Sequence, residues 1–541
     1  MKHLYFILIF NFTSVLTTHA QATFFKTIST SSQTNQSISA GIEFNGHHYF
    51  SASKSTSLSF STMWKTNGTS SGTIDFINSD NVYDAAPIFV FNSELYYLIN
   101  DQNVKKIFKT NGITNTSFLE PIAEAPEVSF DKRTVAIINN NFIFSYGNTI
   151  TGQELYISDG TPTNTPILLK DINSGTNSSN PIYFTKIDNN KIVFRADDGI
   201  NGRELWVTDG TSAGTQLIKN INPTGSSSIN KLTSFNGKAY FSLGNDIWET
   251  DGTEIGTKIF LNLRSNDNSE DPFYEYNGVL YFTAFDATFN KIDLWKTDGT
   301  IIGSSILTSG LNYADVFQKT NNLLFFAASD DAHGYELWRT NGTPTGTFLT
   351  RDINVGPDDS LVSNPSLGNG GDKLFFEATF YDNDDSIEDQ FSNELWASNG
   401  TEIGTLLDTT IDPSSGGGKP DDFFNINGKL IFKANADADN NGTNRGINLW
   451  VANANLLTVD DNENKENTIS IYPNPTKSTF HFKGNTSILQ TATLFSIDGR
   501  KIKTINNPIA GVSISELNYG TYLLTLTFNN GSKQTEKIIK I

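Results

Sequence analysis

Short apolar segments separated by turn-forming residues recur from about residue 22 to residue 455. A compact apolar stretch, such as Ala239-Tyr240-Phe241, is usually entered through Asn-Gly or Asn-Asn. These dipeptides favour hairpin turns because Asn and Gly tolerate positive φ. A Glu-Leu-Trp-x-Thr strand follows, then a turn built on Asp-Gly-Thr or Asn-Gly-Thr, and then a fourth segment such as Gln216 to Ile221. Each unit is therefore predicted to form one antiparallel sheet of four short strands.

The unit occurs nine times, and one aromatic position marks every copy. Successive copies lie 42 to 58 residues apart, which is in or near the range of a four-stranded propeller blade. All seven tryptophans of the chain occupy this position, and the nine residues are Trp64, Phe108, Tyr156, Trp206, Trp248, Trp295, Trp338, Trp396 and Trp450. The predicted fold is an all-β β-propeller, with nine blades by motif count and eight if one drifted unit forms no blade.

The two ends of the repeat region complement each other. The stretch Phe24 to Ile28 resembles a fourth strand without strands one to three before it, whereas the ninth unit loses its Asp-Gly-Thr turn after Trp450. We predict that the N-terminal strand completes the last blade. This non-local pairing would make folding depend on the two ends meeting.

The repeats resemble the bacterial ELWxxDGT repeat proteins. The clearest copy is Glu204-Leu205-Trp206-Val207-Thr208-Asp209-Gly210-Thr211, and the resemblance covers roughly residues 22 to 455. It implies a propeller-like fold in a secreted or surface protein, and it implies no particular activity. Ile113, where Thr is usual, belongs to an early unit that has drifted from the pattern.

Beyond the repeats the composition changes. Residues 456–467 include a charged, Asn-rich run that reads as a linker. Residues 468–541 then hold eight basic and three acidic residues, although acidic residues outnumber basic ones by 58 to 38 in the whole chain. Alternating apolar segments separated by Gly, Asn and Pro predict a small β-sandwich there.

This C-terminal segment resembles the type A sorting domain of Gram-negative type IX secretion. The matching residues are Tyr472, Pro473, Asn474, Pro475, Gly499, Arg500, Gly520, Tyr522, Lys537 and Lys540. The resemblance implies export through the Sec translocon, with a type IX outer-membrane translocon and sortase as later partners. It also implies that the protein is secreted or attached to the outer surface of a Gram-negative bacterium. An ordinary adhesion-type sandwich is the alternative.

Residues 1–22 show the order of a secretory signal peptide, in which a basic start precedes a short apolar run and small residues. Cleavage after Ala20 or after Ala22 fits equally well. No later window is apolar for about 18 residues, so the mature chain, with its repeat region predicted at 23–455, should have no transmembrane segment. The absence of cysteine excludes disulfides and thiolate chemistry, and the acidic balance argues against nucleic-acid binding.

No catalytic residue is assigned from the sequence. His47 and His48 lie side by side in a predicted strand, so their rings point to opposite faces, and His333 lies in a polar loop. Paired carboxylates can perform glycosidic acid–base chemistry, but here Asp pairs are too frequent to mark a site. The Asp of the Asp-Gly-Thr turn is explained by turn chemistry.

Calcium is the one cofactor for which candidate ligands exist. Asp437, Asp439 and Asn441 alternate before Gly442 as at the start of a calcium loop, although Asn448 replaces the usual Glu at the twelfth position. Asp382 and Asp384 lie in a second acidic loop. Both segments connect second and third strands, whose loops vary most and reach their longest in residues 381–393 and 434–447. We expect any ligand to dock on the face that carries these loops.

Three functions remain open. The favoured interpretation is an exported binding or scaffold protein that has an extracellular glycan or protein ligand and is not an enzyme. The alternative is a secreted hydrolase or lyase acting on an extracellular polysaccharide or protein. A purely structural surface protein would need no ligand site at all. A fold of this kind supports all three, so the residues of the site must decide.

Overall fold

The chain is all β and divides into two compact units, Met1–Asn455 and Leu456–Ile541. The computed structural model describes residues 22–540 apart from a set of internal gaps. These gaps are residues 29–37, 39–40, 54–60, 78–81, 102–103, 120–132, 163–166, 245, 266–272, 289, 369–370, 383–389, 410, 412–417, 435–447, 454–468, 475, 484–488, 497–500, 507–510 and 530–532. The predicted signal peptide and the predicted linker at 456–467 therefore lie outside the described residues.

Nine antiparallel sheets follow one another in the described part of the first unit. Sheet 1 consists of β2 (Ile42–Phe44), β3 (His47–Ser53), β4 (Ser61–Thr66) and β5 (Ile74–Asp75). Sheet 2 consists of β6 (Val82–Phe91), β7 (Glu94–Asp101), β8 (Val104–Thr110) and β9 (Asn115–Leu119). Sheet 3 consists of β10 (Val135–Ile138), β11 (Asn141–Asn148), β12 (Gly152–Ser158) and β13 (Ile167–Lys170). The drifted early units thus form sheets like the others.

Sheets 4 to 6 repeat this order, except that the first strand of sheet 6 is divided into two pieces. Sheet 4 consists of β14 (Ile182–Asp188), β15 (Lys191–Asp197), β16 (Arg203–Thr208) and β17 (Gln216–Lys219). Sheet 5 consists of β18 (Asn230–Phe235), β19 (Lys238–Leu243), β20 (Asp246–Thr250) and β21 (Lys258–Leu261). Sheet 6 consists of β22 (Arg264–Ser265), β23 (Phe273–Tyr276), β24 (Val279–Phe285), β25 (Ile292–Thr297) and β26 (Ser305–Leu311).

Sheets 7 to 9 complete the series, and the last one takes its fourth strand from the N-terminal end. Sheet 7 consists of β27 (Tyr313–Lys319), β28 (Leu324–Ser329), β29 (Glu336–Thr340) and β30 (Phe348–Arg351), with the short 3₁₀ helix η1 (Pro344–Gly346). Sheet 8 consists of β31 (Ser363–Leu367), β32 (Leu374–Asp382), β33 (Gln390–Ser398) and β34 (Thr405–Thr409). Sheet 9 consists of β35 (Asp421–Ile426), β36 (Lys429–Ala434), β37 (Asn448–Asn453) and β1 (Thr23–Thr27).

The marker aromatic of each unit lies on the third strand, opposite an aromatic residue of the second strand. This cross-strand pairing holds in all nine sheets, and such pairs stabilise antiparallel sheets. The pairs are Phe50–Trp64, Tyr97–Phe108, Phe144–Tyr156, Phe194–Trp206, Phe241–Trp248, Phe282–Trp295, Phe326–Trp338, Phe376–Trp396 and Phe432–Trp450.

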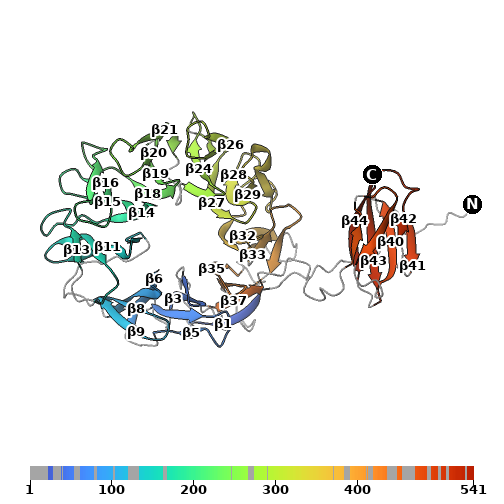
Figure 1. The fold of residues 1–541 in the computed structure, drawn as a ribbon, viewed down its shortest axis with the longest axis horizontal. Coiled ribbons are helices and arrows are strands. Elements are labelled where there is room, and N and C mark those ends of the chain that lie inside the picture. Colours follow the sequence, from blue (N-terminus) through green and yellow to red (C-terminus); the bar gives the residue numbers. More distant parts are fainter. Residues whose placement is uncertain are drawn as a thin grey trace, which may run out of the picture. The chain divides into compact units, whose positions relative to one another are not determined.

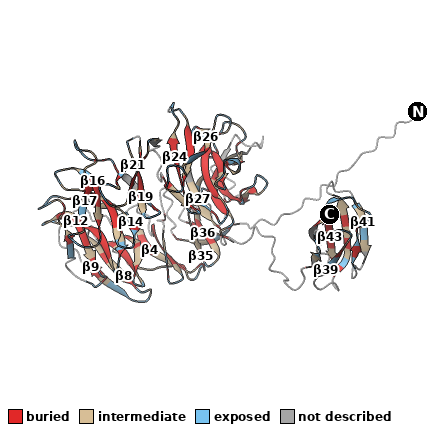
Figure 2. Ribbon diagram, turned by 45° about the horizontal axis from the view of Figure 1, so that its top comes forward, coloured by how far each residue is buried: buried red, intermediate tan, exposed pale blue. Residues whose placement is uncertain are grey.

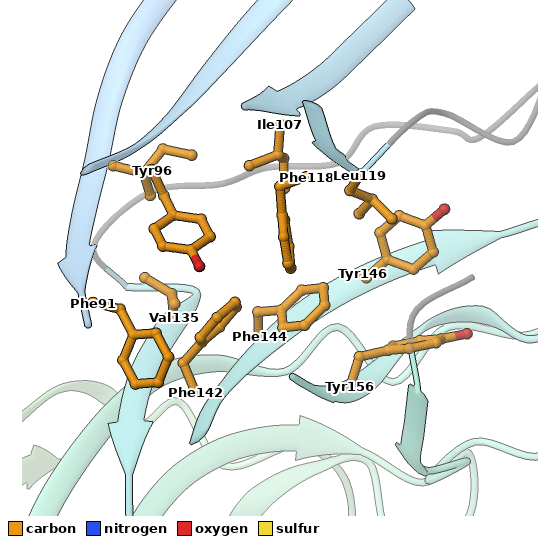
Figure 3. Packing of buried hydrophobic residues seen from close by; sticks show 11 residues of the cluster. Phe91, Tyr96, Ile107, Phe118, Leu119, Val135, Phe142, Phe144, Tyr146 and Tyr156 are labelled. Carbon is orange, nitrogen blue, oxygen red and sulfur yellow. The ribbon is translucent and has the colours of Figure 1, made fainter. Parts of the chain in front are cut away.

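Neighbouring sheets bury these aromatic residues against each other. Between sheets 2 and 3, Tyr96 and Phe91 of one sheet meet Phe142 of the other, with ring centroids 5.4 and 5.2 Å apart (Figure 3). Buried residues line the strands throughout the unit (Figure 2). One sheet of four short strands buries too little surface alone, so each sheet depends on both of its neighbours.

Within the first unit the sheets are arranged in a ring, and sheet 9 packs on sheet 1 (Figure 1). Polar bonds between neighbouring sheets recur around it. The Asn of an Asn-Gly turn donates to the turn that follows the third strand of the next sheet: Asn45 Nδ2 lies 3.1 Å from Asn111 O, and Asn236 Nδ2 lies 3.1 Å from Asp298 O. Asn427 of sheet 9 makes the same bond to Asn67 O of sheet 1, at 2.9 Å.

A second recurring bond shows that β1 takes the place of a fourth strand. A cation at the end of the fourth strand donates to a backbone carbonyl of the next sheet, as Lys219 does to Thr257 O at 3.0 Å and Arg351 to Thr405 O at 2.6 Å. Lys26 of β1 donates to the equivalent Thr73 O at 2.6 Å. The antiparallel pairing of β1 with β37 confirms the predicted completion of the last sheet.

A hydroxyl network explains the repeated Thr-Asp-Gly-Thr turn. Thr208 Oγ1 lies 2.8 Å from Thr215 Oγ1 and accepts a bond from Gly210 N at 3.1 Å. Asp209 Oδ1 accepts bonds from the backbone and hydroxyl of Thr211 at 2.8 and 2.7 Å. Because the same bonds recur in other sheets, the motif is a turn that closes a hairpin, as its composition predicts.

Replacing Thr208 by Val is expected to lower the free energy of unfolding by about 1–2 kcal/mol, because the variant removes the acceptor of Gly210 N and the hydroxyl that bonds Thr215 Oγ1, which keeps only its bond to Thr211 O. Urea denaturation of the whole chain measures this effect. Thr208→Ser is the matched control, since sheet 8 uses Ser398 at the same position. Equal stability of the Val and Ser variants would contradict the assigned role of the hydroxyl.

The second unit contains two sheets around one core, as expected for a small sandwich. One is formed by β38 (Ser470–Tyr472), β39 (Thr479–Lys483) and β42 (Val512–Ser513), and the other by β40 (Leu489–Ser496), β41 (Lys501–Asn506), β43 (Gly520–Phe528) and β44 (Lys533–Lys540). Phe480 and Ile514 are buried together with Leu494, Leu524 and Ile538.

One predicted boundary is wrong. The long loop expected at residues 381–393 is partly a hairpin, because β32 continues to Asp382 and β33 begins at Gln390, directly opposite it. The second and third strands have nine residues each here, more than the second and third strands of the other sheets. Residues 383–389 between them lie outside the described residues.

Candidate functional site

The candidate calcium ligands fall mainly outside the described residues. This holds for Asp384 and for Asp437, Asp439 and Asn441, whereas Asp382 ends β32. Among the residues that the structure describes, no three acidic or histidine side chains converge in a way that would hold a metal ion. The calcium sites therefore stay a prediction.

His47, His48 and His333 make packing or hydrogen-bond contacts with neighbouring side chains. His48 is buried, and its ring stacks on Phe424 of sheet 9 with centroids 3.9 Å apart, so burial lowers the pKa of His48 to about 4. His47 contacts Tyr49 from the same strand. His333 Nδ1 lies 2.9 Å from Asp330 Oδ1, within the loop that joins β28 to β29. None of these rings is placed beside a second histidine.

The Glu of the repeat motif is a buried clasp, a role that motif spacing alone does not reveal. In sheets 3, 4, 7 and 8 it lies on the third strand, two residues before the marker aromatic, and is fully buried, and its carboxylate accepts bonds from the connection that leads to the next sheet. We call these four residues the glutamate clasps: Glu154, Glu204, Glu336 and Glu394. Ile221 N, for example, donates to Glu204 Oε2 at 3.0 Å.

The sequence does carry a signal for these partners. An isoleucine follows each clasp by 17 or 18 residues, and its amide donates to the carboxylate: these are Ile172, Ile221, Ile353 and Ile411. In three of the four connections an asparagine follows it and donates its amide as well. The repeated Asp/Asn-Ile-Asn motif is therefore the counterpart of the Glu in Glu-Leu-Trp.

A second feature, a bulge in the first strand, separates some sheets from the rest. The pairing of strands one and two shifts at the same point in sheets 4, 5, 7, 8 and 9. Tyr183, Asn364 and Asp422 follow the last regular pair in three of these sheets and have φ of 63°, 51° and 54°. Bulges redirect side chains and are frequent beside functional sites.

Charged residues occupy the second-strand position before this bulge in only three sheets. Sheets 4, 8 and 9 have Arg195, Glu377 and Lys433 there. The other six units have uncharged residues: Ser51, Leu98, Ser145, Ser242, Thr283 and Ala327. This departure from the repeat is present in the sequence, but the motif that the units share does not mark it.

Sheets 8 and 9 combine these residues into what we call the bulge cluster: Ser363, Asn364, Glu377, Asn393, Asp421, Asp422 and Lys433. Glu377 accepts bonds from Ser363 Oγ at 2.8 Å, Asn364 Nδ2 at 2.9 Å and Asn393 Nδ2 at 3.1 Å. In sheet 9, Lys433 Nζ lies 3.4 Å from Asp421 Oδ2 and 3.2 Å from Asp422 Oδ2.

The two halves of the bulge cluster are coupled electrostatically. Burial raises the pKa of Glu377, and the Asp421 carboxylate raises it further, against the effect of its three hydrogen bonds. Burial also raises the pKa of Asp422, whereas Lys433 lowers it. Two carboxyls beside the Lys433 ammonium, and a third carboxyl held by amide and hydroxyl donors, offer hydrogen-bond partners for the hydroxyl groups of a ligand. The cluster belongs to the two sheets whose second-to-third-strand loops are predicted to be acidic.

The sorting-motif residues described in the second unit come together at one end. Asn474 Oδ1 accepts a bond from Ile539 N at 2.9 Å, and Lys540 contacts the carbonyl of Lys477 and lies over the Tyr519 ring, 5.3 Å from its centroid. Gly520 and Tyr522 lie on β43, paired with Lys540 and Ile538 of β44. Lys537 lies on β44, Pro473 follows Tyr472, and Pro475, Gly499 and Arg500 lie outside the described residues.

The second unit matches a known family of domains. Residues 470–541 match the secretion system C-terminal sorting domain. The sorting domain directs the protein through type IX secretion to the outer cell surface or the extracellular space of a Gram-negative bacterium. Within the described residues no helix is long and apolar enough to cross a membrane. No curated protein matches the chain.

Solved structures resemble the chain only distantly. A puromycin hydrolase is 10% identical over 67% of this chain and 62% of its own, with a TM-score of 0.34, and a prolyl endopeptidase is 9% identical over 82% and 54%, also at 0.34. The extracellular domain of a hybrid two-component system from B. thetaiotaomicron is 10% identical over 96% and 99%, at 0.29. The chain spans about three fifths of the puromycin hydrolase, and similarity at this level carries no argument about fold or activity.

Proposed function

We propose that residues 23–455 form a nine-bladed β-propeller of the ELWxxDGT type that binds an extracellular ligand after export. The ring of nine sheets and the completion of sheet 9 by β1 support the propeller. The bulge cluster is the observation that carries the binding role, because it breaks the repeat with charged residues where six of the nine units have uncharged ones. A purely structural ring would not require this departure.

The bulge cluster favours a ligand rich in hydroxyl groups or positive charge, such as a glycan or a basic segment of a protein. Its carboxyls and amides offer both acceptors and donors, and the single Lys433 leaves an excess of negative charge. The predicted acidic loops of the same two sheets would add negative charge, with calcium as an optional bridge. An excess of one charge also draws oppositely charged ligands to it.

The test compares binding of the mature chain to a panel of extracellular polysaccharides and basic proteins. We expect Glu377→Gln with Asp421→Asn to weaken binding at least tenfold, since both substitutions keep shape and remove charge. Asp209→Asn with Asp298→Asn is the matched control, because Asn341 and Asn399 occupy the same turn position in other sheets. Binding that is equally strong in both variants would reject the cluster, and release of products by the wild type would favour the hydrolase or lyase.

A further inference from the structure

Two glutamate clasps are linked to a serine that also reaches a backbone carbonyl. Ser179 Oγ lies 2.6 Å from Glu154 Oε2 and 3.3 Å from Gln153 O. Ser360 Oγ lies 2.7 Å from Glu336 Oε2 and 3.0 Å from Tyr335 O. In both cases the carbonyl belongs to the residue just before the clasp, and the serine belongs to the connection that leads to the next sheet.

This arrangement satisfies the carboxyl in either protonation state. When the carboxylate is ionised, the serine hydroxyl donates to it. When the carboxyl is protonated, it donates to the serine oxygen, and the hydroxyl turns to donate to the backbone carbonyl instead. The Oε2 atom that each serine contacts also accepts a bond from a backbone amide, that of Ile172 at 2.7 Å and that of Ile353 at 3.1 Å, so a protonated Oε2 donates to the serine while its lone pair still accepts from the amide. A buried carboxyl without such a second acceptor would leave a proton unpaired.

We propose that Glu154 and Glu336 are proton-operated clasps, which hold the connections at residues 171–180 and 352–361 more firmly when they are protonated than when they are ionised. These connections lie beside the loops between second and third strands. The clasps therefore make the order of this face depend on pH. The device is independent of which ligand the face binds.

The direction of the effect follows from burial. Burial raises the pKa of both Glu154 and Glu336 from 4.5 to about 7, despite the hydrogen bonds that lower it. The folded protein therefore binds protons that the unfolded chain releases. The stabilisation is complete below about pH 4.5 and is lost as the pH rises through about 7.

The charged neighbours do not reverse this direction. Asp352 raises the pKa of Glu336 further. The cations at the ends of the adjoining fourth strands are committed elsewhere, since Lys170 donates to Ser212 O and Arg351 to Thr405 O of the next sheets. The remaining charged groups on the two connections are acidic: Asp171, Asp358 and, bonded to Tyr335 N, Asp359.

The test measures thermal unfolding of the whole chain between pH 5 and pH 8. Gln mimics the protonated clasp, so Glu154→Gln with Glu336→Gln should flatten the profile, whereas the wild type should lose roughly 5 °C or more relative to this variant as the pH rises. The difference between profiles matters because buried His48 titrates with the opposite sign. Glu254→Gln with Glu402→Gln, which changes two exposed turn residues, is the matched control.

Hydrogen exchange supplies a second, local measurement. In the wild type, the amides of Ile172, Asn173, Ile353 and Asn354 should exchange faster at pH 8 than at pH 5.5 after correction for intrinsic rates, and the Gln variant should lose this difference. Parallel melting profiles of the wild type and the Gln variant, or exchange protection that does not change with pH in the wild type, would overturn the proposal.

Discussion

Removing residues 22–28 from the mature chain is expected to lower the melting midpoint by roughly 10 °C, because the deletion opens the ring at its one discontinuous sheet. Ile28 and Phe25 pack in the core shared by sheets 9 and 1, and burial of each such side chain contributes about 1.5–3 kcal/mol. The deletion also removes the Lys26 bonds to Thr73 O and Ser70 O. Differential scanning calorimetry measures the loss directly.

A peptide of residues 22–30 added in trans gives the sharper form of this experiment. The empty edge of β37 should bind it, and binding to the folded state alone should raise the melting midpoint of the truncated chain with peptide concentration. The same peptide with Phe25→Ser and Lys26→Ser is the control. A truncated chain that melts within 2 °C of the intact one would show that sheet 9 closes on sheet 1 without β1.

The pairing of β1 with β37 also links folding to the order in which the strands are synthesised. β1 is made first and β37 nearly last, so the final sheet cannot form until the whole repeat region has been synthesised. Loop closure over such a distance costs entropy before contacts repay it. A protein without cysteine thus holds its ends together by strand pairing, turn hydrogen bonds and buried aromatic residues, all of which recur at the other interfaces.

The repeat made much of the fold predictable. Trp206 and Phe194 meet because they stand at fixed places in adjacent strands, and this local rule holds nine times. Completion of sheet 9 was predictable for a similar reason, since one end had a strand too many and the other a strand too few. The early units, where Phe108 and Tyr156 replace Trp, kept the spacing and therefore kept the sheet.

The candidate site was harder to predict because it depends on contacts between strands rather than on a motif. Ser363, Glu377 and Asn393 lie on three different strands and meet only because the first strand bulges beside them. Coupling of Glu377 to Asp421 further requires the packing of sheet 8 on sheet 9. Sequence periodicity describes what the units share, whereas this cluster consists of the residues by which two units differ.

The glutamate clasps give the second large expected effect. Glu204→Ala should lower the free energy of unfolding by about 3–5 kcal/mol, because the carboxylate accepts bonds from Ile221 N at 3.0 Å, Asn222 N at 3.3 Å and Ser227 Oγ at 2.7 Å. Each buried donor left without a partner costs about 1–3 kcal/mol, and the cavity adds to the loss. Urea denaturation of the whole chain measures the change.

Glu254→Ala is the matched control for this substitution, since Glu254 lies exposed in a turn of the next sheet and should change stability by less than about 0.5 kcal/mol. Glu204→Gln should fall between the two, because an amide oxygen replaces only one of the two acceptors. If Glu204→Ala were no more destabilising than Glu254→Ala, the bonds to the connection would contribute nothing net. The recurrence of Glu two residues before the marker aromatic in the four clasp units would then require another cause, such as folding rate. The connection at residues 220–227 would be held by the bonds of Asn220, Asn222 and Ser226 and by Ser227 N, which donates to Arg203 O.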